Sequence, residues 1–367
     1  MKPKLRAPIG IVKINSEIVE IFKGNIRKSI FYNMNDKVTD LILTLDGKLT
    51  LEEIQKKINI DNEVFESFKS LISTLEIKGI IIDDEYSELD EDKKTYYRII
   101  SMLEDYSKNK NDTYTAWNNI KNSKVLIIGI GAVGSWIALN MVQSGVRNLI
   151  LMDNDVVDIT NLHRQWGYTE DDVGKYKVDV LKERLLEFNN FLNIEIINSY
   201  LENDTLYKFK LNDVDLIINC ADFPNVDITS EIVSSYCMKY SINHIIAGGY
   251  NKHVSLLGQT IIPFQTACYK CFDIQLKNRY NNKMNQLKKL IIPDRKIGSF
   301  GPMCTISASL SSLDAIKILS KLIPPTNINK RGEFDIYKMD INYLKFDKLN
   351  DCPWCGVDGI YTKKGLL

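Results

Sequence analysis

Three charged residues in the middle of the chain have the side-chain types needed to act on a triphosphate: Arg164, Lys177 and Asp222. An arginine presents a planar fork of hydrogen-bond donors and a lysine a mobile point charge, and both stabilise negative charge that builds on phosphoryl oxygens. A carboxylate can hold the magnesium ion that bridges phosphate groups. These residue types indicate a reaction in which a carboxylate oxygen attacks the α-phosphorus of a nucleotide and pyrophosphate leaves.

A glycine pattern upstream of these residues is typical of a nucleotide-binding turn. Gly129, Gly131 and Gly134 follow the apolar run VLII and open a predicted helix, whose free N–H groups and positive dipole end suit phosphates. Asp153 lies nineteen residues after Gly134, at the end of the next apolar run, where a carboxylate can hold a ribose hydroxyl. The order strand, glycine turn, helix, strand and aspartate predicts a nucleotide site.

Each cation also has a simpler interpretation when it is taken alone. Arg164 could form a surface ion pair and Lys177 could be a solvated helix residue, because most exposed ion pairs contribute little. Their occurrence together with the glycine pattern, Asp153 and Asp222 favours the phosphoryl chemistry.

Four of the seven cysteines form two CxxC pairs, Cys268/Cys271 and Cys352/Cys355. Two such pairs complete a tetrahedral zinc site with no open position, which predicts a structural zinc. Redox-active thiols or a buried reduced cluster are the alternatives. The remaining three are Cys220, Cys237 and Cys304. The first two are expected in the core. Cys304 could lie near the nucleotide, although a small buried cysteine at a helix start is commoner. No thioester nucleophile is identified.

Two domains are expected to position these groups, at 1–92 and 93–367. In the second domain, apolar strands alternate with amphipathic helices, which predicts a Rossmann-like, mostly parallel α/β sheet. In the first, short strands within 9–33 precede a helix ended by Gly47, a helix capped by Thr50, a helix near 62–78 and a strand at 80–83. This order predicts a small winged-helix-like α+β domain, and the acid-rich segment 83–94 is the expected linker.

Composition argues against several classes of partner. The chain has 47 basic and 47 acidic residues, and segment 61–78 carries four acids against two lysines, so a nucleic-acid partner is not expected. No apolar stretch is long enough to span a bilayer and no signal peptide is recognised, so no membrane association is expected. These features favour a soluble, cytoplasmic protein.

The motif order from Gly129 to Asp222 resembles the ThiF/MoeB/HesA branch of the ubiquitin-activating enzyme superfamily. That order is GxGxxG, D-x-D, N-L-x-R-Q, a lysine and an aspartate, and the resemblance continues through 299–319 to the CxxC pairs. It implies an adenylating nucleotidyltransferase that uses ATP and magnesium. Lys175 competes with Lys177 for the lysine position, but the spacing from Arg164 favours Lys177. The resemblance implies that Asp153 and Asp155 bind the ribose side of the nucleotide. It also implies that Asn161, Arg164 and Gln165 contact the triphosphate. Lys177 is expected to contact the phosphates and Asp222 to bind magnesium, again by resemblance.

With its N-terminal domain included, the chain resembles the microcin C-type peptide nucleotidyltransferases. The resemblance implies that the first domain binds a short ribosomal precursor peptide by adding it as a strand to a sheet edge. It also implies a homodimer, in which Arg98 reaches the neighbouring subunit's nucleotide site. Segment 277–296 falls where relatives carry a loop over the active site; a solvated basic face is the alternative.

Three functions remain open at this point. The first is ATP- or CTP-dependent nucleotidyl transfer to the C-terminal end of a peptide in antibiotic biosynthesis. The second is activation of a ubiquitin-like sulfur carrier, whose bacterial enzymes generally lack the N-terminal module. The third is non-catalytic presentation of a peptide to a cyclodehydratase, although such relatives often lose the phosphate-contacting residues that are present here. The base, the peptide and its terminal residue are not indicated by the sequence.

Overall fold

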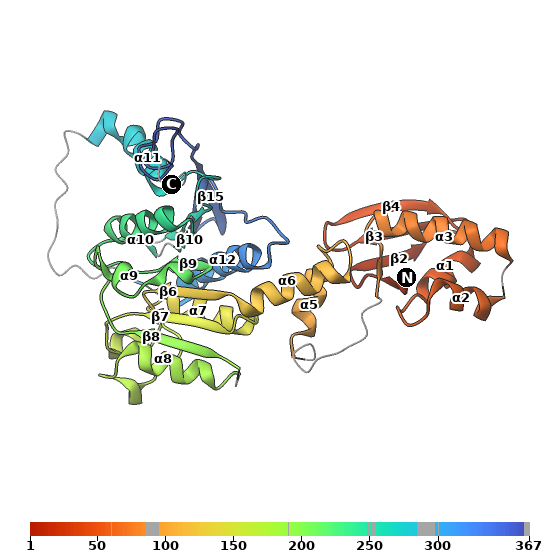
Figure 1. Cartoon of the computed structure of the whole chain (residues 1–367), viewed down its shortest axis with the longest axis horizontal. Coiled ribbons are helices and arrows are strands. Elements are labelled where there is room, and N and C mark those ends of the chain that lie inside the picture. Colours follow the sequence, from red (N-terminus) through yellow and green to blue (C-terminus); the bar gives the residue numbers. More distant parts are fainter. Residues whose placement is uncertain are drawn as a thin grey trace. The chain divides into compact units, whose positions relative to one another are not determined.

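The computed structural model describes residues 1–59, 61–84, 95–189, 191–247, 250–251, 254–284, 298–299 and 301–362. Most of the predicted linker 83–94 and much of the predicted loop 277–296 lie outside the described residues. The chain divides into two compact units, Met1–Asn118 and Asn119–Leu367 (Figure 1). This boundary falls inside a helix and later than residue 92, because the first helices after the predicted linker contact the N-terminal unit. The functional division at 92 therefore stays a prediction.

The first unit contains two small antiparallel sheets and five helices among its described residues. The sheets have the strand orders β1-β5 and β2-β3-β4. The strands are β1 (Pro3–Leu5), β2 (Ile9–Lys13), β3 (Ile18–Lys23), β4 (Lys28–Asn33) and β5 (Ile81–Asp83). The helices are α1 (Asp36–Leu43), α2 (Leu51–Ile58), α3 (Asn62–Ile77), α5 (Tyr97–Glu104) and α6 (Lys110–Asn122). The predicted order of strands, three helices and a closing strand is confirmed.

Local signals explain why these helices begin and end where they do. Thr50 accepts a hydrogen bond from the backbone N–H of Glu53, and the Glu53 side chain accepts one from the Thr50 N–H, which completes the expected capping box of α2. Asp61 caps α3 in the same way through the N–H of Val64. Gly79 follows α3 with φ +65°, a conformation that favours glycine.

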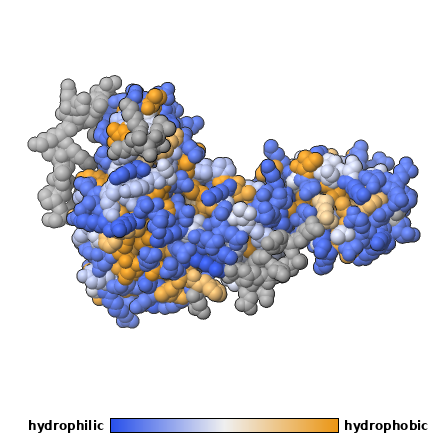
Figure 2. Space-filling view, in the orientation of Figure 1, coloured by the Kyte–Doolittle hydropathy of each residue, from blue (hydrophilic) through white to orange (hydrophobic). Residues whose placement is uncertain are grey.

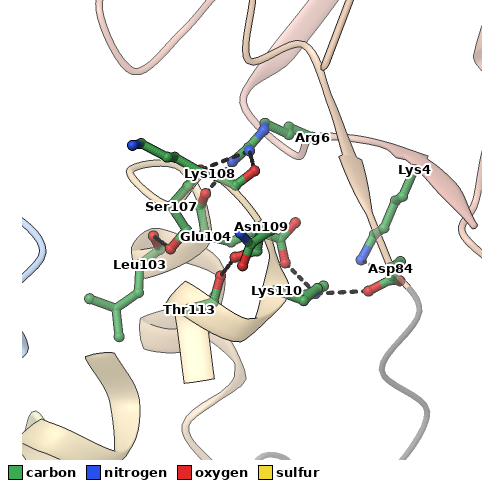
Figure 3. A network of polar contacts seen from close by, with 10 residues as sticks. All are labelled: Lys4, Arg6, Asp84, Leu103, Glu104, Ser107, Lys108, Asn109, Lys110 and Thr113. Carbon is green, nitrogen blue, oxygen red and sulfur yellow. Dashed lines mark hydrogen bonds and ion pairs between the residues drawn. The ribbon is translucent and has the colours of Figure 1, made fainter. Parts of the chain in front are cut away.

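A buried polar network ties β1 to the end of α5 within the first unit (Figure 3). The Arg6 guanidinium donates to the carbonyl oxygens of Glu104, Ser107 (2.8 Å) and Lys108 (3.3 Å). These carbonyls have few helical partners because they lie at or beyond a helix C-terminus, where a cation is favourable. Lys110 bridges the carboxylates of Glu104 and Asp84, the latter at 2.9 Å. The network fixes α5 and α6 to the small β1-β5 sheet.

The second unit is built on a six-stranded sheet of order β13-β10-β9-β6-β7-β8. Every neighbouring pair is parallel except β10 and β13, which confirms the predicted mostly parallel sheet. The strands are β6 (Lys124–Ile128), β7 (Asn148–Met152), β8 (Asn193–Ile197), β9 (Leu216–Asn219), β10 (Asn243–Ile246) and β13 (Thr260–Ile261). The central strands β6, β7 and β9 are almost wholly buried apolar runs, as expected for a sheet covered on both faces.

Helices connect and cover these strands, and a second sheet lies nearer the C-terminus. The helices are α7 (Gly134–Gln143), α8 (Lys177–Leu186), α9 (Thr205–Lys208), α10 (Val226–Tyr240), α11 (Tyr269–Met284) and α12 (Gly301–Ser320). Short 3-10 turns are η1 (Ile159–Asn161), η2 (Glu170–Asp172) and η3 (Leu211–Asp213). The antiparallel sheet β11-β12-β14-β15 comprises Tyr250–Asn251, Val254–Leu257, Lys330–Asp335 and Asp340–Lys345. Helix α12 packs on α7 and β12, and α10 packs on β9 and β10.

Among the described residues, no helix combines the length and the apolar character that crossing a membrane would need. Most of the surface visible in Figure 2 is hydrophilic on both units.

Candidate nucleotide site and cysteine cluster

A cavity of about 580 Å³ in the second unit is lined by residues that follow the carboxyl ends of β6, β7 and β9. In open parallel sheets, ligands bind at this edge. The cavity is lined by these predicted site residues: Gly129, Gly131, Asp153, Asp155, Asn161, Arg164, Gln165, Lys177 and Asp222. The structure therefore brings together segments that are up to 93 positions apart, since the set runs from 129 to 222.

The glycine turn between β6 and α7 is shaped by close backbone contacts. Gly129 has φ +79°, and a Cβ there would lie 2.7 Å from the backbone nitrogen of Ala221. A Cβ on Gly134 would lie 1.9 Å from the carbonyl oxygen of Gly129. Gly131 differs, because its nearest neighbour would be the flexible Gln165 side chain at 3.7 Å. Two glycines are thus needed for the turn itself, and the third leaves open space in front of the α7 N-terminus.

Asp153 is held against this turn by two backbone donors. Its carboxylate accepts hydrogen bonds from the N–H groups of Ile130 and Asp155, each at 2.8 Å. Burial raises the pKa of Asp153, although the Lys177 charge and these two bonds act in the opposite direction. The carboxylate is therefore fixed in position between the glycine turn and the cavity, as an acceptor for a ligand hydroxyl must be.

The two candidate lysines differ sharply in their surroundings. Lys177 begins α8 with a side chain only 5% exposed, and its ammonium lies 2.8 Å from the Asp155 carboxylate. Lys175 is 58% exposed, pairs with Asp172 at 3.1 Å, and is not among the residues that line the cavity. The preference for Lys177 over Lys175, made from spacing alone, thus agrees with the geometry of the cavity.

Arg164 and Gln165 follow η1 and face the cavity with unused hydrogen-bonding capacity. The Arg164 guanidinium donates to the carbonyl oxygen of Thr160 and lies 3.4 Å from a ring nitrogen of His163. The Arg164 Nε and the Gln165 Oε1 are buried atoms with no hydrogen-bond partner among the described residues. Buried polar atoms normally find partners, so these two indicate that a polar ligand completes the site.

Asn161 and Asp222 also line the cavity. The Asn161 side chain accepts from the N–H of Asp158 at 3.1 Å, which closes the η1 turn that presents Arg164. Asp222 lies just beyond β9 and is exposed. Its hard carboxylate oxygens suit a magnesium ion at the cavity wall.

Of the three lone cysteines, Cys237 and Cys304 are buried and Cys220 is partly buried. Burial raises the pKa of Cys220, Cys237 and Cys304, which disfavours the reactive thiolate. Cys220 lines the cavity beside β9, and Cys237 is wholly buried in α10. Cys304 is buried in the first turn of α12, with its sulfur 3.9 Å from the Ser299 hydroxyl.

The two CxxC pairs meet in space although 84 positions separate each contacting pair. The Cys268 sulfur lies 3.8 Å from the Cys271 sulfur and 3.6 Å from the Cys352 sulfur. The Cys271 sulfur lies 3.4 Å from the Cys355 sulfur. All four are buried, with their sulfurs within 4.8 Å of one another. Tetrahedral zinc with bonds of about 2.3 Å separates its ligand sulfurs by about 3.8 Å. The cluster therefore fits a zinc ion without rearrangement of the chain.

The ThiF family model matches residues 106–354. The chain belongs to the ThiF family. This confirms the predicted branch of the ubiquitin-activating superfamily and its nucleotidyltransferase class. The Escherichia coli sulfur carrier protein ThiS adenylyltransferase is 29% identical over 241 residues, covering 64% of this chain and 86% of that protein. The adenylyltransferase and sulfurtransferase UBA4 of Scheffersomyces stipitis is 26% identical over 257 residues. This chain spans only about half of that second relative, 54% of its length.

Solved structures resemble the whole length of this ThiF-family chain. The crystal structure of Escherichia coli MccB with ATP has a TM-score of 0.76 and 25% identity, covering 97% of this chain and 100% of that one. The crystal structure of Escherichia coli MccB with AMPCPP and MccA has a TM-score of 0.75 and 24% identity, with the same coverage of both chains. The structure of PaaA gives 0.71 at 22% identity, over 94% of this chain and 100% of that one. These likenesses cover nearly the whole chain and so confirm the fold of both units. The match to the ThiS relative covers only 64% of the chain.

Several cavity residues of this ThiF-family chain were not anticipated from the sequence. They come from the last residue of β9 and from the helices, turn and strand that follow it, and carry no motif of their own. They are Asn219, Asp227, Ser230, Gln259, Tyr269, Phe272 and Arg331. Tyr269 and Phe272 lie within and directly after the first CxxC pair, so that pair was the one available signal. Arg98, the predicted trans-acting arginine, is exposed on α5 in the first unit.

Proposed function

We propose that this chain is a nucleotidyltransferase that activates the C-terminal carboxylate of a short ribosomally made peptide, using ATP or CTP and releasing pyrophosphate, in peptide antibiotic biosynthesis. The observation that carries the proposal is the convergence of Arg164, Lys177 and Asp222 on one cavity in front of the α7 N-terminus. A dehydrogenase does not need this set, because hydride transfer develops no charge on the phosphates.

Each residue has a task in the proposed reaction. Asp153 accepts from a ribose hydroxyl, and the glycine turn admits the phosphates to the α7 N–H groups. A peptide carboxylate oxygen attacks the α-phosphorus, the bond from that phosphorus to the bridging oxygen breaks, and the electron pair leaves with pyrophosphate. Arg164 and Lys177 stabilise the charge that develops on the phosphoryl oxygens. Asn161 and Gln165 orient the triphosphate next to them.

Asp222 would hold a magnesium ion, which neutralises phosphate charge when bound. Its exposed carboxylate at the cavity wall supports this role. The four-cysteine cluster would hold a structural zinc. Four thiolates leave no open position for catalysis, and a four-thiolate zinc site suits a reducing, cytoplasmic setting.

The N-terminal unit is proposed to bind the peptide as an added strand. In the β2-β3-β4 sheet, β4 is an edge strand whose outer side pairs with no other strand in the part of the chain that the structure describes, and Phe31 on it is 62% exposed. An edge strand offers backbone donors and acceptors in register for an extended peptide, and an exposed aromatic side chain offers a contact for its side chains. The full-length likeness to MccB, solved with MccA, supports the same reading. A homodimer with Arg98 acting across it is part of the proposal.

Activation of a sulfur-carrier protein is the second candidate, and the names of two bacterial relatives favour it: ThiS adenylyltransferase and molybdopterin-synthase adenylyltransferase. Those matches cover 64% and 65% of this chain, whereas the likeness to MccB covers 97%. A non-catalytic peptide presenter is the third candidate. It is disfavoured because the phosphate-handling side chains are all retained around the cavity.

One experiment separates the three candidates. The purified chain is incubated with magnesium and either ATP or CTP, together with a pool of short peptides with free C-termini or with a small protein ending in Gly-Gly. Pyrophosphate release and a mass increase of one nucleoside monophosphate on a peptide are expected. Turnover only with the Gly-Gly protein would establish the second candidate, and tight peptide binding without pyrophosphate would establish the third.

A further inference from the structure

The cavity is larger than its phosphate-handling part, and the remainder has its own chemistry. Beyond β9 its wall is formed by the first turns of α10 and α11, the turn before β13, and β14. Among the residues there are Ser230, Gln259, Tyr269, Phe272 and Arg331. None of them belongs to the glycine turn or to the segment from Asp153 to Lys177. We call these five residues the distal wall.

Two buried polar atoms on the distal wall lack partners among the described residues. Ser230 is 1% exposed, and its Oγ makes no hydrogen bond there. Gln259 is 3% exposed; its Nε2 donates to the carbonyl oxygen of Ala267 at 3.0 Å, which leaves its Oε1 as an unpaired acceptor. An unpaired buried polar group is unfavourable, because it has lost its hydrogen bonds to water without gaining new ones. Two such groups on one cavity wall indicate a ligand that supplies hydrogen-bond donors.

Arg331 adds a cation to the same wall. Its guanidinium stacks over the Phe272 ring, 5.7 Å from the ring centroid, and forms no ion pair with the residues that the structure describes. The aromatic face fixes the guanidinium while leaving its N–H donors available. Together, the distal wall offers a positive donor group and a buried acceptor, which match a carboxylate next to an N–H group.

The nucleotide base has another place to go, so it does not account for the distal wall. A small adjoining cavity of about 60 Å³ shares Gly129, Asp153 and Asp222 with the main one. It is also lined by Tyr200 and Phe223, whose rings lie 5.7 Å apart and are 50% and 69% exposed. Because Asp153 is the proposed ribose acceptor, a base attached to that ribose falls on the side of these two rings, where it can stack.

We propose that the distal wall is the acceptor subsite. In it, Arg331 binds the terminal carboxylate of the substrate, and Gln259 and Ser230 bind the N–H group of its last residue. This inference rests on the proposed function and names the part of the substrate that the site reads. Arg331 holds one carboxylate oxygen and leaves the other free to attack the α-phosphorus. Asp227 also lines this side of the cavity, so its negative charge opposes carboxylate binding and tunes the affinity.

The test uses N-acetylglycine as a probe, because it carries one carboxylate next to one amide N–H. The chain is first loaded with magnesium and a non-hydrolysable ATP analogue. The analogue occupies Arg164 and Lys177, so the carboxylate of the probe cannot bind to them instead. Saturation-transfer NMR is expected to detect N-acetylglycine on the natural chain, and much weaker binding of the neutral N-acetylglycinamide. Absence of N-acetylglycine binding at millimolar concentrations would overturn the proposal.

Matched variants assign the binding to the distal wall. Arg331→Gln is expected to bind the probe about 10- to 100-fold more weakly. Arg279→Gln is the control, since Arg279 also stacks on an aromatic ring, Phe346, at 5.0 Å but does not line the cavity. Ser230→Ala removes a hydroxyl that has no described partner, so this variant should fold normally and bind N-acetylglycine more weakly. Asp227→Asn should bind N-acetylglycine more tightly, because a negative charge on the same wall is removed.

The outcomes also separate this inference from the proposed function. Equal probe binding by Arg331→Gln and the natural chain would overturn the subsite. Loss of nucleotide analogue binding in Arg331→Gln would show that this arginine binds the nucleotide, and would also overturn the proposed acceptor subsite. A natural chain that binds N-acetylglycine through Arg331 yet transfers no nucleotide to any peptide would leave the subsite standing and remove the proposed function.

Discussion

The buried ammonium of Lys177 lies 2.8 Å from the carboxylate of Asp155, which is itself 56% exposed. The backbone N–H of Lys177 also donates to the Asp155 carbonyl at 3.0 Å, so the start of α8 is fixed to the end of the β7 segment. Lys177 is thus held in place by the fold, whereas the Asp155 carboxylate faces solvent at the cavity. A phosphoryl oxygen that enters the cavity can replace the carboxylate while the lysine stem stays in place.

Replacing Lys177 by alanine is expected to abolish most nucleotidyl transfer, because a fixed cation near the α-phosphorus is lost. The expected loss is on the order of 10²–10³ in rate. Lys175→Ala is the matched control, since that lysine is two positions away, exposed, and paired with Asp172. The measurement is the initial rate of pyrophosphate release at saturating nucleotide. Near-normal turnover of Lys177→Ala would remove this residue from the mechanism.

Asp222→Ala should lower transfer by a similar factor, on the order of 10²–10³ in rate. Because the carboxylate is exposed, the fold should be unaffected. If Asp222 holds magnesium, the variant should need a higher magnesium concentration for half-maximal rate, whereas Asp171→Ala, an exposed carboxylate of η2, should not. An unchanged magnesium dependence in Asp222→Ala would contradict the assignment.

The residues that could be predicted from the sequence belong to motifs in which local chemistry and position coincide. Gly129 and Gly134 are needed by the turn itself, as their close backbone contacts explain. Asp153 follows a strand directly, so its position at the sheet edge is set by that strand. The two CxxC pairs were recognisable because together they can supply the four thiolates of a structural zinc site, which implies that distant segments meet.

The distal wall could not be predicted, because its members share no local pattern. Ser230 is one of several serines in α10, and Arg331 lies in a strand that pairs with β12 and β15. Their approach to Gln259 depends on how α10, β14 and the turn before β13 cross in three dimensions. The attachment of α5 to the first unit could not be predicted either, since the Arg6 contacts that join the end of β1 to α5 span about a hundred positions.

Loss of one cluster cysteine is expected to cost the zinc and much of the stability of the second unit. Cys271→Ser should reduce the metal content from about one zinc per chain to near zero. Its melting temperature should fall, because Tyr269 and Phe272 pack with the cluster in one core. Cys304→Ala should keep its zinc, since that residue lies outside the cluster. Metal analysis and thermal unfolding are the measurements; full zinc content in Cys271→Ser would exclude a four-thiolate site.

Asp105 should make the stability of the first unit depend on pH. Burial, followed by the neighbouring Glu104 charge, raises the pKa of Asp105 to about 6, while Arg6 acts in the opposite direction. The folded state therefore holds this proton more tightly than the unfolded chain, whose aspartate pKa is about 3.9. The contribution is present in full below pH of about 4 and is lost as the pH rises through about 6.

Asp105→Asn removes the carboxylate that must ionise next to Glu104. Its melting temperature should exceed that of the natural chain above pH of about 6, and the two should converge near pH 4. Because Asp105 is half-buried, solvent screens part of the effect, and a shift of a few degrees is expected. Asp171→Asn is the control, because it makes the same substitution at an exposed carboxylate in the second unit. A difference between Asp105→Asn and the natural chain that is the same at every pH would show that the pKa of Asp105 is equal in the folded and unfolded states, so that its protonation does not contribute to folding.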